Sequence, residues 1–200
     1  MKIKICGLFR SEDIDYVNEA RPDYAGFVFA QSRRQVSPEK AARLRSRLDG
    51  GIVPAGVFVN APAADIAALY RDGVISIAQL HGSEDEDYIK RLKDLCAVPV
   101  IRTIKVDEQN LLFPVPCSLF TDFLLIDSGA GSGKPFNWNA LKTHEITKPW
   151  FLAGGINLDN IEKAIALNPY AIDVSSGAET DGLKDREKII RLTARLVGSS

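Results

Sequence analysis

Cys6 and Asp127 are residues of types that can transfer protons, and each ends a short apolar run. Cys6 ends the run 2–6, and Asp127 ends the run 123–127. A thiol acts as a general base where a nearby cation or a helix end lowers its pKa. A carboxyl group that is partly removed from water has its pKa raised, so it can donate a proton near neutral pH. The pair therefore predicts acid–base chemistry on a substrate that reaches both groups.

Each candidate residue also has an ordinary structural interpretation. Buried free cysteines are commonly small apolar fillers, and Cys96 and Cys117 are interpreted in this way. Asp127 could equally cap a helix or brace a loop. His81 fits a structural hydrogen bond and a substrate contact equally well, and Asp173 is a further possible substrate contact. The place of each residue in the fold decides between these interpretations.

Glycine and serine follow the last two apolar runs and predict an anion site. Gly154 and Gly155 follow one run, and Ser176 and Gly177 follow the next. Glycines let the backbone approach a phosphate closely and expose its N–H groups. A tight turn would explain one such pair alone, whereas two pairs after consecutive runs favour phosphate binding.

The glycine-rich segment 128–135 does not fit a nucleotide-binding motif. A Walker A loop requires Gly where Ser128 stands, and Ser or Thr where Pro135 stands. Glycine hinges and the single cation Lys134 instead predict a lid over an anionic ligand.

Arg33 and Arg34 follow the second apolar run. By default they are solvated surface charges. An arginine on the rim of a site that faces inward would instead bind a planar carboxylate through two parallel hydrogen bonds.

Short apolar runs alternate with longer amphipathic segments along the whole chain. The runs are rich in β-branched and aromatic residues, nearly unbroken in hydrophobicity and too short for helices. Such runs are typical of parallel strands that are covered on both faces. The predicted strands are residues 2–6, 24–29, 53–59, 75–80, 100–104, 123–127, 150–153 and 171–174.

Start and stop signals predict helices between these strands. Ser37 followed by Pro38 begins a helix that runs to residue 48, and Ser83 begins another with a capping box. Further helices are predicted over residues 157–168 and 185–197. Residues 108–118 contain two prolines and predict a short or irregular connection.

Eight strand–helix units without a linker predict a single (β/α)8 barrel domain over residues 1–200. The alternative is an open doubly wound sheet, which is expected to carry a phosphate fingerprint after its first strand. Residues 6–10 carry none. In a barrel the carboxyl ends of the strands form the functional face, so the candidate residues are expected on one rim.

Composition narrows the classes of partner. The 200 residues include 25 Lys+Arg and 26 Asp+Glu, which give a net charge of −1. No bulk positive field is available for nucleic acid, so a bound anion is expected to be small. No run approaches the roughly 20 apolar residues of a membrane span, and the first residues are unlike a secretory signal. Three cysteines without a CxxC pair fit a reducing cytoplasm.

Motifs along nearly the whole chain resemble those of the phosphoribosylanthranilate isomerase family of tryptophan biosynthesis. In chain order they are KICG (4–7), GFVF (26–29), SRR (32–34), GVFV (56–59), QLHG (79–82), LIDS (125–128), GSGK (131–134), LAGG (152–155) and DVSSG (173–177). The opening KICG together with the closing SSG is highly specific. The departures are Asn137 where Asp is expected and Ile156 where Leu is commoner, and neither bears on the expected chemistry.

The resemblance implies an Amadori rearrangement of N-(5-phosphoribosyl)anthranilate to 1-(2-carboxyphenylamino)-1-deoxyribulose 5-phosphate. It implies Cys6 as the general base, Asp127 as the general acid and Arg34 as the ligand of the substrate carboxylate. A cationic Schiff base would supply the electron sink, so no metal or organic cofactor is expected. The expected partner is a small phosphorylated substrate, and the chain is expected to be a monomer, with a homodimer as the alternative.

Other functions are weighed against this one. A related aldose–ketose isomerase of histidine biosynthesis would use an aspartate base on its first strand, where Cys6 stands. A ribulose-phosphate epimerase would need a metal, and only His81 of the two histidines is placed for ligation. A binding module would hold a phosphorylated ligand without turnover, and the presence of both an acid and a base argues against it.

Overall fold

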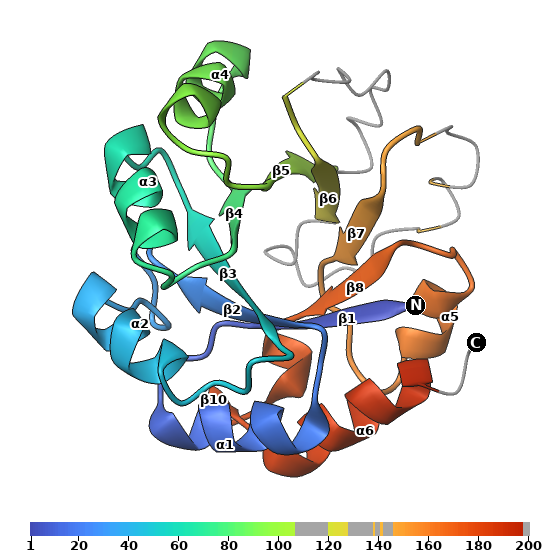
Figure 1. The fold of residues 1–200 in the computed structure, drawn as a ribbon. Helices are drawn as coiled ribbons and strands as arrows, with labels where there is room; N and C mark the ends of the chain where they lie inside the picture. Colours follow the sequence, from blue (N-terminus) through green and yellow to red (C-terminus); the bar gives the residue numbers. More distant parts are fainter. Residues whose placement is uncertain (107–119, 128–137, 139–140, 142–145, 198–200) are drawn as a thin grey trace.

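Eight parallel strands close into a barrel in which each strand pairs with the next and the last pairs with the first (Figure 1). The structure is a computed structural model that describes residues 1–106, 120–127, 138, 141 and 146–197. The strands are β1 (Lys2–Cys6), β2 (Tyr24–Val28), β3 (Val53–Phe58), β4 (Ile77–Leu80), β5 (Val100–Lys105), β6 (Phe123–Asp127), β7 (Trp150–Ala153) and β8 (Ala171–Val174). The predicted (β/α)8 barrel is confirmed, and β1, β6, β7 and β8 have the predicted bounds.

Helices cover the outside of the barrel (Figure 1). The described α-helices are α1 (Ser11–Ala20), α2 (Pro38–Arg45), α3 (Ala63–Arg71), α4 (Glu86–Leu95), α5 (Ile161–Ile165) and α6 (Arg186–Val197). Among the described residues, no helix is long and apolar enough to cross a bilayer. The predicted connection 108–118, the predicted lid 128–135 and Cys117 lie outside the described residues.

Two predicted helix starts are wrong. Helix α4 begins at Glu86 because Asp85 is its N-cap and accepts a hydrogen bond of 2.8 Å from the Tyr88 N–H. Ser83 instead donates its hydroxyl to Asn60 Oδ1 at 3.0 Å. Helix α5 begins at Ile161 rather than at residue 157, since residues 157–160 form a turn. Ser37 does cap α2, as predicted, but α2 ends at Arg45 rather than at residue 48.

A short hairpin that the sequence analysis did not predict follows β8. After the 3-10 helix η2 (Ser176–Ala178), strands β9 (Glu179–Thr180) and β10 (Leu183–Lys184) pair antiparallel. Their turn consists of Asp181 and Gly182, which both have positive φ, at 51° and 80°. Asp-Gly with positive φ at both positions is the preferred two-residue hairpin turn, so the signal was present in the sequence.

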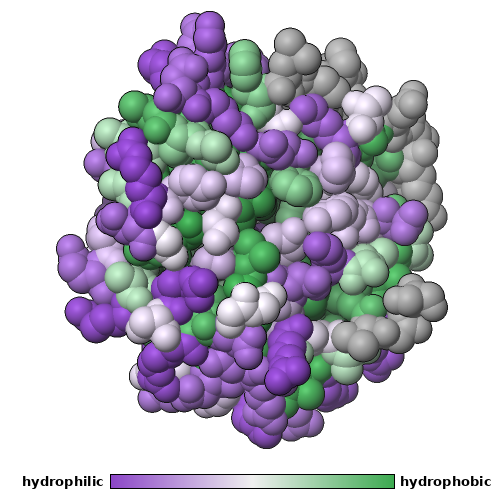
Figure 2. All heavy atoms as spheres, viewed as in Figure 1, coloured by the Kyte–Doolittle hydropathy of each residue, from purple (hydrophilic) through white to green (hydrophobic). Residues whose placement is uncertain are grey.

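The apolar core has two layers. Ile3 and Ile5 of β1 point outward against the helices, and their neighbours Lys4 and Cys6 point into the barrel, because side chains alternate along a strand. A second cluster fills the barrel interior with residues from its strands, including Tyr24 and Phe151. Figure 2 shows hydrophobic residues reaching the surface near the centre of one face, within a largely hydrophilic periphery.

Candidate active site

A pocket of about 310 Å³ lies at the carboxyl ends of the strands. Its walls include the last residues of β1, β6 and β7, which are Cys6, Asp127 and Ala153. Of the predicted site residues, the following line it: Cys6, His81, Asp127, Gly154, Gly155, Asp173 and Ser176. Arg34 and Gly177 are not among the lining residues. The structure thus brings the predicted acid, base and first phosphate loop to one cavity.

Cys6 is a buried free thiol at the end of β1. It pairs in register with Gly26 of β2, and a Cβ on that glycine would lie 2.7 Å from the Cys6 Sγ. Only glycine therefore leaves room for the sulfur. Burial raises the pKa of the Cys6 thiol, and the positive charges of Lys4 and Lys184 oppose this only in part. The cations expected beside the thiol are present, but burial outweighs them.

Lys4 is a buried charged residue inside the barrel, and the sequence analysis did not single it out. Its side chain is fully buried, and its Nζ donates to Asp173 Oδ2 at 2.8 Å and to Gln79 Oε1 at 2.5 Å. Lys4 and Asp173 are register partners on β1 and β8. Burial disfavours the ammonium, but Asp173 and then Cys6 outweigh it and raise the pKa of Lys4. A lysine two residues before Cys6, on the same strand face, was the available sequence signal.

His81 and Asp127 meet on the opposite side of the pocket. His81 Nε2 lies 3.3 Å from Asp127 Oδ2, and both side chains are about a quarter exposed or less, at 25% and 20%. The other ring nitrogen, Nδ1, lies 3.2 Å from Gln79 Nε2 and 3.2 Å from Thr103 Oγ1. His81 thus contacts the predicted acid, in addition to lining the cavity.

The two predicted phosphate loops lie against each other. Gly154 and Gly155 have φ of 99° and 64°, a region that favours glycine. A Cβ on Gly177 would lie 1.9 Å from the carbonyl oxygen of Ile156, so only glycine permits the loop after β8 to approach the loop after β7. Gly177 supports the site through this contact, while Ser176 lines the cavity.

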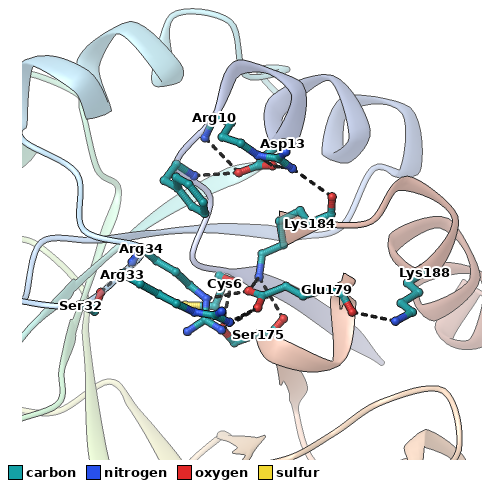
Figure 3. A network of polar contacts seen from close by, with 11 residues as sticks. Cys6, Arg10, Asp13, Ser32, Arg33, Arg34, Ser175, Glu179, Lys184 and Lys188 are labelled. Atoms are coloured by element: carbon teal, nitrogen blue, oxygen red, sulfur yellow. Dashed lines mark hydrogen bonds and ion pairs between the residues drawn. The ribbon is translucent and has the colours of Figure 1, made fainter. Parts of the chain in front are cut away.

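Arg34 lies beside the pocket and makes an ion pair with Glu179 of the hairpin (Figure 3). Its Nε and Nη2 donate to the two carboxylate oxygens at 2.6 and 2.8 Å. A Cβ on Gly7 would lie 2.4 Å from the Arg34 Cδ, so the aliphatic stem of Arg34 packs over the residue next to Cys6. Arg33 and Lys184 also bind this carboxylate. Burial would raise the pKa of Glu179, but the hydrogen bonds from Arg34 and Lys184 lower it overall.

The cluster of Arg33, Arg34, Glu179 and Lys184 was not predicted as a unit. Arg34 already has the bidentate carboxylate partner that was expected from a substrate, and its role in substrate binding stays a prediction. In the described part of the chain, no three His, Cys, Asp or Glu side chains are grouped as metal ligands would be.

Comparison with known proteins identifies the family. Residues 3–195 match the family model described as "N-(5'phosphoribosyl)anthranilate (PRA) isomerase". The isomerase of this name from Endomicrobium trichonymphae is 48% identical over 195 residues, which cover 94% of this chain and 94% of that protein. The chain belongs to the N-(5'-phosphoribosyl)anthranilate isomerase family. The resemblance seen in the motifs is confirmed.

Solved structures of phosphoribosylanthranilate isomerases share the fold. The enzyme from Thermus thermophilus superposes with a TM-score of 0.85 at 32% identity, with all of both chains covered. A phosphoribosylanthranilate isomerase in complex with reduced 1-(o-carboxyphenylamino)-1-deoxyribulose 5-phosphate superposes with a TM-score of 0.83 at 30% identity, covering 99% of each chain. The predicted barrel and the predicted isomerase class are both confirmed by these relatives.

Proposed function

We propose that this chain converts N-(5'-phosphoribosyl)anthranilate to 1-(2-carboxyphenylamino)-1-deoxyribulose 5-phosphate in tryptophan biosynthesis. The observation that carries the proposal is that Cys6 and Asp127, from β1 and β6, line one pocket of about 310 Å³. A base and an acid on opposite walls can both reach one sugar, which is what an acid–base isomerisation needs.

Asp127 acts first, as the general acid. In its protonated form it donates to the ribose ring oxygen, while the anthranilate nitrogen lone pair forms a C1=N bond. The C1–O bond breaks, and the product is an open-chain cationic Schiff base. This step consumes one proton from the enzyme, and positioned acids of this kind contribute about 10²–10⁴-fold to rate.

Cys6 acts second, as the general base. Its thiolate removes the proton from sugar C2, and the C–H electron pair forms a C1=C2 bond as the iminium nitrogen becomes neutral. In the resulting enolamine, C1 gains the proton that Cys6 had taken, and the C2 hydroxyl loses its proton to give the ketone, which restores the acid form of Asp127 directly or through water. C1 is reduced and C2 is oxidised within one molecule, so the route requires no external redox partner. Lys4 and Lys184 supply the positive charge that favours the thiolate.

The ends of the substrate are held by separate groups. The loops with Gly154, Gly155, Ser176 and Gly177 bind the phosphate, and Arg34 binds the anthranilate carboxylate in exchange for, or beside, Glu179. Asp173 Oδ1 is buried and lacks a hydrogen-bond partner among the described residues, so it accepts a hydrogen bond from a sugar hydroxyl. Anchoring both ends places C1 and C2 between acid and base.

The experiment is to supply the anthranilate ribotide to purified protein and follow the loss of its aromatic fluorescence. We expect turnover by the wild-type protein, and none above the buffer rate when Cys6→Ala and Asp127→Asn are combined. A fluorescence trace equal to that of buffer alone for the wild-type protein would refute the proposed function.

We also propose that residues 1–200 form one domain, that it works as a monomer in the cytoplasm, and that a homodimer is the alternative. The unpaired Cys6 and Cys96 support a reducing compartment. Light scattering on a sizing column distinguishes one chain of 21.9 kDa from twice that mass.

A further inference from the structure

We infer that Lys4 and Gln79 are positioning residues that fix the tautomer of His81 and thereby determine which oxygen of Asp127 carries the acidic proton. The inference rests on a continuous chain of contacts across the barrel mouth, from Lys4 through Gln79 and His81 to Asp127. Only its last step rests on the proposed function, in which Asp127 is the acid.

The direction of the first hydrogen bond is set by Lys4. A lysine ammonium has three donors and no acceptor, so the group 2.5 Å from its Nζ must be an oxygen. Gln79 therefore directs its carbonyl Oε1 to Lys4. Because Lys4 is fully buried and paired with Asp173, it has little freedom to turn away from this contact.

The orientation of Gln79 determines which ring nitrogen of His81 carries the proton. With Oε1 bound to Lys4, the amide NH2 is the group that lies 3.2 Å from His81 Nδ1. An amide nitrogen donates and does not accept, so Nδ1 must present its lone pair. The Thr103 hydroxyl, also 3.2 Å from Nδ1, can donate to the same lone pair. The ring proton of the neutral imidazole then lies on Nε2.

The position of the proton on His81 in turn determines which oxygen of Asp127 carries the acidic proton. His81 Nε2 lies 3.3 Å from Asp127 Oδ2, so a proton on Nε2 faces Oδ2 and favours it as an accepting oxygen. A neutral carboxyl group has one hydroxyl oxygen and one carbonyl oxygen. If Oδ2 is the accepting carbonyl oxygen, the proton that Asp127 delivers to the sugar is carried by Oδ1. The buried lysine thus orients the acid through two intermediate side chains, on the far side of the pocket from Cys6.

The direct test is nitrogen-15 NMR of the histidine ring in the wild-type protein, in which a bare ring nitrogen and a protonated one give distinct signals. The chain has two histidines, and the set of signals that is lost in His81→Asn is assigned to His81. We expect a protonated Nε2 and a bare Nδ1 for His81. The reverse pattern, or two protonated nitrogens at neutral pH, would overturn the inference.

The discriminating variant is Gln79→Glu. A carboxylate still accepts from Lys4, but its second oxygen cannot donate to Nδ1, so we expect the ring proton to move to Nδ1. Loss of a residue that orients a metal ligand costs about 10–100-fold in activity, and we expect a loss of the same order here, in kcat with KM nearly unchanged. Asn18→Asp is the matched control, because it makes the same amide-to-acid change on α1, on the outside of the barrel, and should change neither the NMR signals nor kcat.

The outcomes separate this inference from the proposed function. If Gln79→Glu does not fold, Gln79→Met removes the same donor without adding charge, and loss of the single tautomer is expected. An unchanged tautomer in either folded variant overturns the inference, as does a moved proton with unchanged kcat. If the wild-type protein shows the expected tautomer and the Gln79→Glu shift but isomerises nothing, the proposed function fails and the positioning chain stands.

Discussion

Two buried lysines lie near Cys6, and their environments differ in how the counterion of each is shared. Lys4 and Lys184 each bind a buried carboxylate, at 2.8 Å to Asp173 and at 2.7 Å to Glu179. Asp173 serves Lys4 alone among the described cations, whereas Glu179 is shared with Arg33 and Arg34 (Figure 3). The difference lies in the number of cations that each carboxylate must neutralise.

The pKa values of the two lysines shift in opposite directions. Burial is the largest influence on both, and it favours the neutral amine. Asp173 and then Cys6 together overcome burial, and the pKa of Lys4 is raised. Glu179 does not overcome it, Arg34 adds repulsion, and the pKa of Lys184 is lowered. The comparison teaches that burial alone does not set the pKa of a lysine, because the result also depends on its counterion and on the other charges beside it.

The largest effect is expected from removing the base beside the two lysines or the acid across the pocket from them. Cys6→Ala and Asp127→Asn should each lower kcat by at least about 10²-fold, since each removes the only assigned base or acid. The circular dichroism spectrum should stay that of the wild-type protein. A folded variant with near-normal kcat would remove that residue from the mechanism.

The next largest difference is expected in the unfolding free energies of variants that lack one lysine or the other. Lys4→Met leaves Asp173 as an uncompensated buried charge, and breaking such a pair costs about 3–5 kcal/mol. Lys184→Met should cost less, because Arg33 and Arg34 still neutralise Glu179. Urea unfolding of the two variants measures both values. Equal losses would contradict the role given to counterion sharing.

Arg34 offers a smaller effect, in substrate binding. Arg34→Ala should weaken binding by about 1.5–3 kcal/mol, the value of a lost charged hydrogen bond, and it should raise KM with kcat less affected. Arg34→Lys keeps the charge but lacks the planar fork, so it should recover only part of the loss. An unchanged KM in Arg34→Ala would remove Arg34 from substrate binding and leave it a structural role in the ion pair with Glu179.

The pH dependence distinguishes the lysines in a different way. Cys6 must be a thiolate, so kcat/KM should fall as the pH drops below the pKa of Cys6, which burial raises. Lys4 opposes this rise more strongly than Lys184 does. Lys4→Met should therefore raise the pKa of Cys6 further and move this acidic limb of the kcat/KM profile to higher pH. Lys184→Met should move it less. A limb that is unmoved in Lys4→Met would show that Cys6 does not titrate in it.

The smallest effect concerns a carboxylate that supports the fold outside the pocket. Asp185 accepts from the Lys188 N–H at 3.0 Å and from the Thr180 hydroxyl at 2.7 Å, and these contacts lower the pKa of Asp185. Asp185→Ala should cost about 1 kcal/mol as a lost N-cap. A lowered folded pKa gives stability that is present above the unfolded value of about 3.9 and is lost as the pH falls through the folded value. The difference in unfolding free energy from wild type should thus shrink in acid, and a difference independent of pH would refute the cap.

Local patterns predicted the strands well and the loops less well. The strands were found because parallel strands covered on both faces must be apolar on both faces, which leaves a run in the sequence. The start of α4 was misplaced because Ser83 and Asp85 can both cap a helix. Asn60, 23 residues away, decides between them because its Oδ1 accepts a hydrogen bond from the Ser83 hydroxyl, which leaves Asp85 to cap the helix. The hairpin that holds Glu179 and Lys184 was missed although its Asp-Gly turn was visible.

The sequence by itself determined the barrel, and with it the rim on which Cys6, Asp127 and the glycine loops lie, because side-chain periodicity and chain order are local properties. Tertiary structure alone decided the charges at that rim. Lys4 meets Asp173 across 169 residues of sequence, and Arg34 meets Glu179 across 145. Protonation depends on loss of water and on charges a few ångströms away, and folding supplies both from distant segments.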